Sequence, residues 1–177
     1  MNFNGAQLHL LTNHLPVVGS LFATLVLLSG LLLKNSSVRR TGLALLAFAA
    51  LTTLPAYFSG EPAEEKIEDL PGVSESLIHD HEEAAEATLV VLALMGVVAA
   101  GGLALGRMRR ESLESKAQWA SLALGVVSAG FLANTAHLGG FIRHPEIRPA
   151  GLASSEAGVP HENAKAGEGN EEGDHDE

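Results

Sequence analysis

The chain contains no cysteine among its 177 residues. Thiolate-ligated iron–sulfur clusters, covalently attached c-type haem, blue-copper sites and cysteine nucleophiles all need that residue, so the sequence excludes them. It also contains no recognisable nucleophile–base pair and no phosphate-binding glycine loop, which argues against an enzyme that acts by itself. Any metal chemistry must therefore use histidine, methionine, carboxylates or the backbone.

Charged residues are almost absent from four long stretches. These stretches cover residues 15–33, 42–58, 84–106 and 117–136, and their only charged residue is Glu86. A helix needs about 20 apolar residues to cross the hydrocarbon core of a bilayer. The sequence therefore predicts an all-α membrane protein, a bundle of four transmembrane helices. The expected helices cover about 8–33, 42–58, 75–106 and 117–138.

The four-helix transmembrane domain is expected to occupy residues 1–149. Residues 150–177 are rich in glycine, alanine and glutamate and have little apolar surface to bury. This composition is typical of a disordered segment, so we predict a disordered acidic C-terminal tail.

Basic residues are concentrated in two short segments between the apolar stretches. They are Lys34, Arg39, Arg40, Arg107, Arg109, Arg110 and Lys116. Short loops rich in lysine and arginine stay in the cytoplasm. The remaining loop, residues 59–83, has nine acidic residues and one lysine, and the tail has eight acidic residues and one lysine. We therefore expect a multi-pass protein of a bacterial inner membrane with both termini on the periplasmic side.

The acidic charge lies on the predicted outer side. Such a surface disfavours nucleic acid as a partner and would attract a basic soluble protein such as a cytochrome c.

Six of the eight histidines precede the tail, and all six fall on the predicted outer side. They are His9, His14, His79, His81, His137 and His144. At a rise of about 1.5 Å per residue, His14 and His137 are expected at similar heights near the outer edge of the hydrocarbon. Two helical residues that are two positions apart point to opposite sides of the helix, so at most one of His79 and His81 faces inward. Imidazoles gathered at one height are candidate ligands for a metal or a haem iron.

A bis-histidine b-type haem needs imidazoles from two helices, small residues beside the rings and cations near the propionates. The axial candidates are His14, His81 and His137, with His9 or His144 as a further ligand if there are two haems. Arg143 and Arg148 are the candidate cations, and Asn134 lies beside His137 as a further cofactor contact. The ligand pairing stays open at this point, and so does a quinone pocket near His137.

Small residues recur at helical spacing beside two of these histidines. Ala133 and Gly130 precede His137, and Ala85 and Thr88 follow His81. Such stripes either bring two helices close together or leave a slot for a flat macrocycle. The Gly139-Gly140 pair is predicted to end the last helix, since glycine suits the left-handed conformation after a final turn.

Four segments carry a resemblance to a known family. They are "HLLTNHLP", "YFSGEPAEEKIEDLPGV", "HDHEEAAEATL" and "AHLGG". They resemble the motifs His-(x4)-His-x-Pro, Gly-x-x-Ala-Glu, His-Glu and His-x-Gly-Gly of a family of small bacterial four-helix membrane proteins of unknown function. The resemblance covers most of residues 9–140 and matches His9, His14, His81 and His137, whereas Leu10 stands where many relatives have proline. Some relatives are fused to Rieske-type domains, which implies a redox setting.

The leading prediction is a b-type haem-binding membrane protein that transfers electrons, as a small subunit of a larger respiratory or photosynthetic complex. Its expected partners are the other membrane subunits of that complex and a soluble cytochrome c. One alternative is an outer-face copper or zinc site built from "HDHEE", His9, His14 and carboxylates. Another is a cofactor-free structural subunit.

Overall fold

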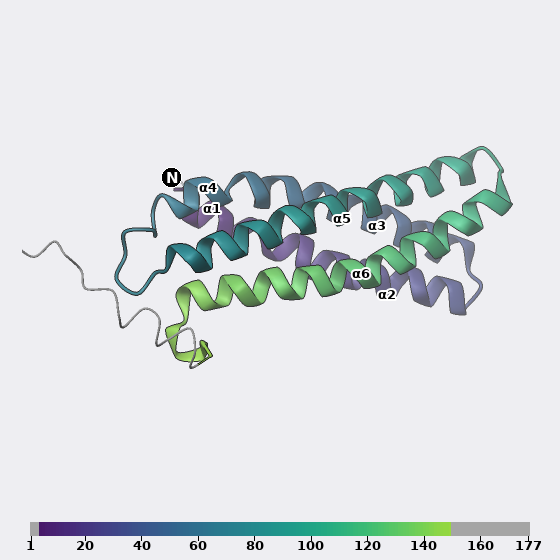
Figure 1. Ribbon diagram of the computed structural model, residues 1–177. Coiled ribbons are helices and arrows are strands. Elements are labelled where there is room, and N and C mark those ends of the chain that lie inside the picture. The colour runs from purple at the N-terminus through teal and green to yellow at the C-terminus, as the bar shows by residue number, and fades with distance from the viewer. Residues whose placement is uncertain (1–3, 150–177) are drawn as a thin grey trace, which may run out of the picture.

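The computed structural model describes residues 4–149, which form helices and contain no strand (Figure 1). In chain order the elements are α1 (Gly5–Thr12), α2 (His14–Leu32), α3 (Ser36–Phe58), α4 (Gly60–Glu64), α5 (Glu75–Arg107), α6 (Glu111–Arg143) and the 3-10 turn η1 (Pro145–Ile147). Within this range four helices are long and apolar enough to cross a membrane, with α1 and α2 counted as one. The predicted all-α fold, with four helices long and apolar enough to cross a membrane, is thus confirmed. The predicted disordered tail lies outside the described residues.

The four long helices form a closed ring. α2 packs on α3, α3 on α5, α5 on α6, and α6 returns to α2. The short α2–α3 and α5–α6 loops lie together at one end, and α1, α4 and η1 lie at the other (Figure 1). The basic residues around the two short loops therefore share one end of the bundle, which we call the basic end. The acidic segment and the candidate histidines share the opposite end, which we call the acidic end.

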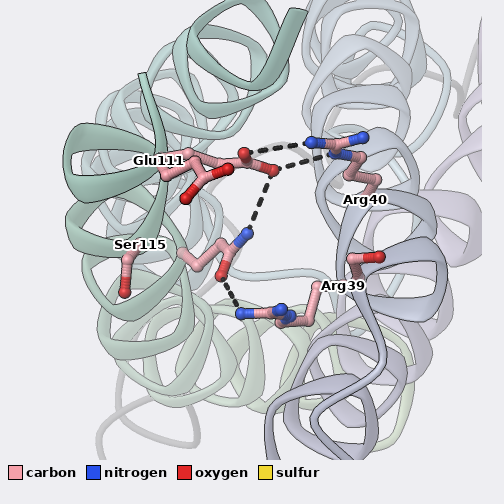
Figure 2. Close-up of a pocket in the computed structure, with 7 residues that line it drawn as sticks. Arg39, Arg40, Glu111 and Ser115 are labelled. Carbon is pink, nitrogen blue, oxygen red and sulfur yellow. Dashed lines mark hydrogen bonds and ion pairs between the residues drawn. The ribbon is translucent and has the colours of Figure 1, made fainter. Parts of the chain in front are cut away.

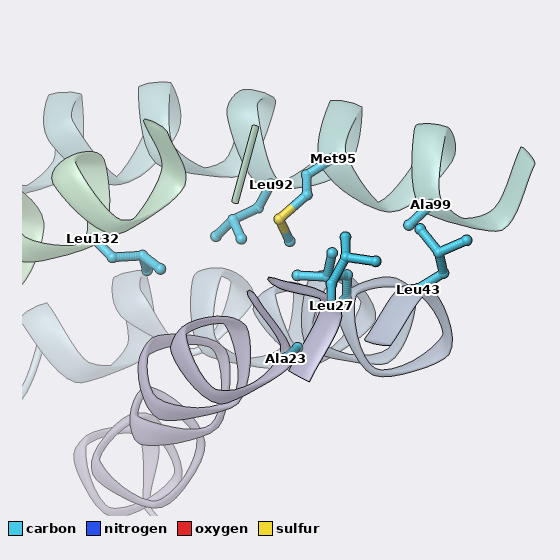
Figure 3. Packing of buried hydrophobic residues seen from close by; sticks show 8 residues of the cluster. Ala23, Leu27, Leu43, Leu92, Met95, Ala99 and Leu132 are labelled. Carbon is cyan, nitrogen blue, oxygen red and sulfur yellow. The ribbon is translucent and has the colours of Figure 1, made fainter. Parts of the chain in front are cut away.

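The interior of the bundle is a narrow apolar core. It consists of Ala23, Leu27, Leu43, Leu46, Leu92, Met95, Ala99 and Leu132, contributed by all four long helices (Figure 3). Many of the larger apolar side chains point outward instead, among them Phe22 and Phe48, each 62% exposed. In water such a surface would drive aggregation, whereas lipid solvates it. Small and hydroxyl residues at the contacts let the helix backbones approach closely, as is common in membranes.

The helix boundaries differ from the predicted ones mainly at the start of α3, which begins at Ser36, and at both ends of α6. α6 covers 33 residues and runs through Gly139 and Gly140 to Arg143, so the prediction that these glycines end it is wrong. Gly139 allows a close approach, because a Cβ there would lie 3.1 Å from Cε1 of His81 and the ring would have to shift by a few tenths of an ångström. A Cβ at Gly140 would make only an ordinary contact with Ile147, at 3.6 Å.

The two small-residue stripes have different environments. The stripe that follows His81 is buried at Thr88 and Leu92, and it faces the bundle interior. The stripe that precedes His137 is exposed at Gly130 and Ala133. α6 turns Leu132 inward, and His137 lies five residues further on, which is about 140° around the helix.

Candidate functional site

Two of the candidate histidines meet at the acidic end of the bundle. His9 on α1 and His81 on α5 are both half-buried, and their ring centroids lie 6.5 Å apart with an interplanar angle of 81°. They come from helices that are far apart in the sequence and that do not pack extensively on each other. The approach of the two rings is therefore fixed by what each ring binds.

Each imidazole of this pair is anchored to a backbone carbonyl of a different helix. Nδ1 of His9 lies 3.0 Å from the carbonyl oxygen of Ala56 on α3, and Nδ1 of His81 lies 2.9 Å from that of Thr135 on α6. A carbonyl oxygen can only accept a hydrogen bond, so Nδ1 carries the proton in both rings. In the neutral imidazole Nε2 then holds a free lone pair, and neither Nε2 has a hydrogen-bond partner within residues 4–149. Two imidazole nitrogens with unused lone pairs are thus available.

A small network of hydrogen bonds between α5 and α6 lies next to His81. The hydroxyls of Thr88 and Thr135 are 2.8 Å apart, and Thr135 also donates to the carbonyl oxygen of Ala84 at 3.1 Å. The network ties α5 to α6 just below His81 and fixes the carbonyl that orients its ring. Ala56 and Thr135 were missed as site residues, because a backbone acceptor has no sequence signature.

The other candidate histidines lie apart from this pair. His14 is exposed and its Nδ1 bonds the Leu10 carbonyl one turn back on its own helix, at 3.1 Å. His137 is also exposed and packs its ring on Phe141, with centroids 4.3 Å apart. His79 is exposed while His81 faces inward, so the prediction that at most one of them does so is confirmed. The structure thus brings together His9 and His81 but brings neither His14 nor His137 to them.

His144 lies beyond α6, on the short turn that follows the helix. Its Nδ1 pairs with the Glu146 carboxylate at 2.9 Å. The pKa of Glu146 lies below its ordinary value, because its own backbone N–H and the His144 ring donate to the carboxylate. This exposed pair makes His144 a partner of Glu146 and keeps it away from the His9–His81 pair.

The two candidate arginines have different surroundings. Arg143 is exposed on the last turn of α6. Arg148 is buried, and its guanidinium donates to the carbonyl oxygens of Phe141, Ile142 and Gly72 at 2.7, 3.3 and 2.8 Å. The guanidinium therefore joins the end of α6 to the loop that precedes α5. Asn134 is exposed beside a shallow pocket of about 360 Å³ between α5 and α6.

Two carboxyl groups meet near the start of α5. Glu64, the last residue of α4, hydrogen-bonds the side chain of Glu82, and this bond raises the pKa of Glu64 to about 7, with smaller contributions from desolvation and from the Glu82 charge. Two carboxyl groups can share a hydrogen bond only when one of them is protonated. The contact between α4 and α5 is therefore sensitive to pH.

Raising the pH through 7 is expected to loosen α4. The folded-state pKa of Glu64 lies above its value of 4.5 in the unfolded chain, so the contact stabilises the fold fully below about pH 4.5 and is lost as the pH rises through about 7. Amide hydrogen exchange in α4, corrected for its intrinsic pH dependence, should be slower at pH 5 than at pH 8. Glu64→Gln should remove this difference, and the exposed control Glu65→Gln should keep it. Equal protection of wild-type α4 at the two pH values would contradict the expectation.

No known protein family, curated protein or solved structure matches the chain. The resemblance drawn from the four sequence segments stays a prediction. The site must therefore be interpreted from its own geometry.

Proposed function

We propose that this chain is a membrane electron-transfer protein that binds a b-type haem between His9 and His81. The observation that carries the proposal is that the two imidazole rings make the same kind of hydrogen bond. Each donates Nδ1–H to a carbonyl of another helix and leaves its Nε2 lone pair free. Histidines that ligate metals characteristically make this second hydrogen bond, because it fixes the tautomer and the ring orientation.

The donor set fits a haem iron. A six-coordinate haem takes two axial ligands from the protein, and the pair supplies two imidazoles. Metal–nitrogen distances are about 2 Å, so two imidazoles that would hold one ion must lie close together. The His9 and His81 rings are 6.5 Å apart. Gly139, where a side chain would press on the His81 ring, keeps that ring free to take its orientation from Thr135.

The haem would supply one-electron chemistry, and the chain's own residues would set its conditions. The carbonyls of Ala56 and Thr135 orient the two imidazoles through their Nδ1–H groups. The exposed Arg143 remains the candidate cation for a propionate, while the Arg148 guanidinium serves the end of α6.

The proposed setting is a bacterial inner membrane with the acidic end of the bundle on the periplasmic side. The basic loops would then face the cytoplasm, in line with the positive-inside rule. Residues 59–86 carry ten acidic residues and one lysine, and they lie at the same end of the bundle as the His9–His81 pair. This charge favours docking of a basic cytochrome c. We further propose that the chain works as a small subunit beside other membrane subunits of a respiratory or photosynthetic complex.

Absorption spectra of the detergent-purified protein test the proposal. Oxidised and dithionite-reduced samples from a haem-replete host should show the sharp bands of a six-coordinate b haem, with a pyridine haemochrome assay giving about one haem per chain. His9→Ala and His81→Ala should each abolish the six-coordinate spectrum, because each removes an axial ligand. The matched control is His79→Ala, which removes an exposed imidazole two residues from His81 on the same helix.

Variants of His14 and His137 distinguish the proposed ligand pair from the ligands expected from the sequence. With His9 and His81 as ligands, His14→Ala and His137→Ala should keep the bands. Loss of the bands in these variants, with His9→Ala and His81→Ala unaffected, would refute the pairing but keep the haem. A colourless wild-type protein would refute the haem itself. Copper or zinc retained in stoichiometric amount by such a protein would instead support the transition-metal alternative.

A further inference from the structure

A polar pocket lies at the basic end of the bundle, opposite the histidines. Its volume is about 330 Å³, and it opens between the first turns of α3 and α6 (Figure 2). Its lining consists of Ser36, Arg39, Arg40, Glu111, Glu114, Ser115 and Gln118. Trp119, the neighbour of Gln118, is 58% exposed, as expected for an aromatic side chain at a membrane–water interface. The pocket thus lies at the level of lipid headgroups.

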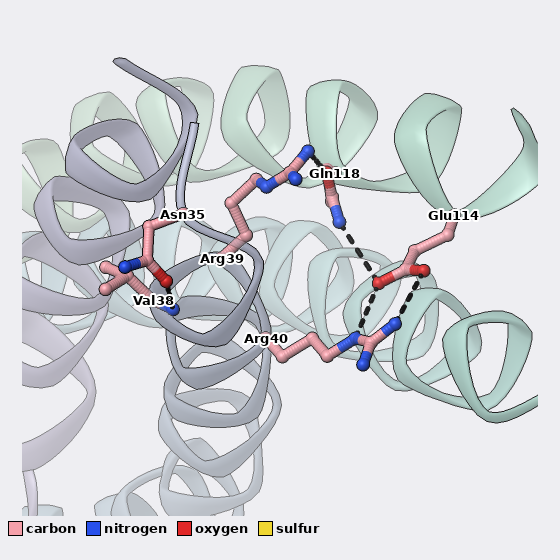
Figure 4. Close-up of polar contacts among 6 residues, drawn as sticks. All are labelled: Asn35, Val38, Arg39, Arg40, Glu114 and Gln118. Carbon is pink, nitrogen blue, oxygen red and sulfur yellow. Dashed lines mark hydrogen bonds and ion pairs between the residues drawn. The ribbon is translucent and has the colours of Figure 1, made fainter. Parts of the chain in front are cut away.

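One pair of charges in the pocket is already matched. The guanidinium of Arg40 forms two hydrogen bonds with the carboxylate of Glu114, at 2.9 and 3.1 Å, and joins α3 to α6 (Figure 4). Gln118 donates to the same carboxylate at 3.3 Å and accepts from Nη1 of Arg39 at 3.2 Å. Glu114 is buried, with only 8% of its side chain exposed. The contacts of Arg40, Glu114 and Gln118 hold α3 and α6 together, and the net charge of these three side chains is zero.

The second pair of charges in the pocket, Arg39 and Glu111, forms no ion pair within residues 4–149. Nε of Arg39 is buried and has no hydrogen-bond partner within residues 4–149. Glu111 lines the pocket but forms no hydrogen bond or ion pair with another side chain in the same range. Arg39 is bound only through Gln118, which is neutral. The pocket therefore presents one positive group on α3 and one negative group on α6 that interact with opposite charges only at longer range within the described residues, and we call them the unmatched pair.

We propose that this pocket binds the headgroup of phosphatidylethanolamine. The phosphate would accept hydrogen bonds from Arg39 and from the Ser36 hydroxyl at the start of α3, where the helix dipole also favours an anion. The ammonium group would donate to the Glu111 carboxylate. The headgroup carries one negative and one positive charge. It would therefore offer an opposite charge to both Arg39 and Glu111 and add no net charge to the pocket.

Other phospholipids fit the unmatched pair less well. A phosphatidylglycerol headgroup brings a phosphate but leaves Glu111 without a cation. Phosphatidylcholine brings a cation whose nitrogen has no hydrogen to donate. Free inorganic phosphate shares the Arg39 chemistry but has neither the ammonium nor the acyl chains.

Native mass spectrometry of the full-length protein in detergent tests the proposal. The protein is incubated with equimolar dioleoyl-phosphatidylethanolamine, -phosphatidylglycerol and -phosphatidylcholine, and the bound fractions are compared. Phosphatidylethanolamine should be retained most strongly. Arg39→Gln should weaken its binding about tenfold, the usual effect of losing a charged hydrogen bond. Glu111→Gln should remove the preference for phosphatidylethanolamine over phosphatidylglycerol while lipid binding persists.

Lys116→Gln is the matched control, since it removes an exposed charge at the same end that does not line the pocket. It should leave the preference unchanged. Because Glu111→Gln changes selectivity and retains a bound lipid, its result does not depend on the folding of Arg39→Gln. Equal retention of the three lipids, unchanged binding by Arg39→Gln, or displacement of the lipid by millimolar inorganic phosphate would each overturn the proposal.

Discussion

Gly42→Ala is expected to destabilise the bundle by about 3 kcal/mol, because it inserts a methyl group where two backbones touch. A Cβ at Gly42 would lie 2.6 Å from Cα and 2.7 Å from the backbone nitrogen of Leu27. Backbone atoms cannot rotate out of the way as a side chain can, so α2 and α3 must move apart. Leu27 and Leu43 are fully buried at this contact, and the separation would open the core around them. The measurement is unfolding by SDS in mixed micelles.

Gly101→Ala is the matched control for this prediction. Gly101 also lies within a membrane-crossing helix, α5, but a Cβ there meets no atom within 4 Å. Alanine has the higher helix propensity, by up to about 1 kcal/mol, so this variant should be as stable as the wild type or slightly more stable. If the two variants unfold at the same SDS fraction, the close approach of α2 to α3 at Gly42 is wrong.

The fold could be predicted from the sequence because its main signal is local. Four charge-poor stretches of membrane-crossing length identify the helices, and the basic residues between them identify the loops that share one end. The orientation of each helix about its own axis was harder to predict. In water the apolar face of a helix identifies the core, but in α6 both faces are apolar, and the inward face is the one with Ser121 and Ser128. For this reason the sequence did not show that Gly130 and Ala133, beside His137, are exposed.

The site was predictable in part. The histidines and their common end of the molecule follow from the sequence, and the face argument correctly allowed only one of His79 and His81 to point inward. The pairing of His9 with His81 could not be predicted, because it depends on the carbonyls of Ala56 and Thr135. Those acceptors are backbone atoms, and only the packing of α1 on α3 and of α5 on α6 brings them to the rings.

Arg148→Ala is expected to release the end of α6 from the loop that precedes α5. The guanidinium is buried and donates to three carbonyl oxygens, two at the end of α6 and one at Gly72. A hydrogen bond from a charged group stabilises by about 1.5–3 kcal/mol, and the variant would leave several carbonyls without this donor. The buried side chains of Leu77, Ile78, Phe141 and Ile142 form a small apolar cluster between the end of α6 and the start of α5. The free energy of local opening should therefore fall by about 3 kcal/mol.

Amide hydrogen exchange measured peptide by peptide checks this prediction. Exchange should accelerate in residues 72–78 and 141–147, while the centre of the bundle around Leu92 and Met95 keeps its protection, since it packs independently of the end. Arg148→Lys should recover only part of the protection, because a lysine ammonium lacks the planar fork that reaches carbonyls on two segments at once. Arg143→Ala, which removes an exposed arginine from the same helix end, should exchange like the wild type. Unchanged exchange in Arg148→Ala would mean that the apolar cluster alone holds the loop to α6.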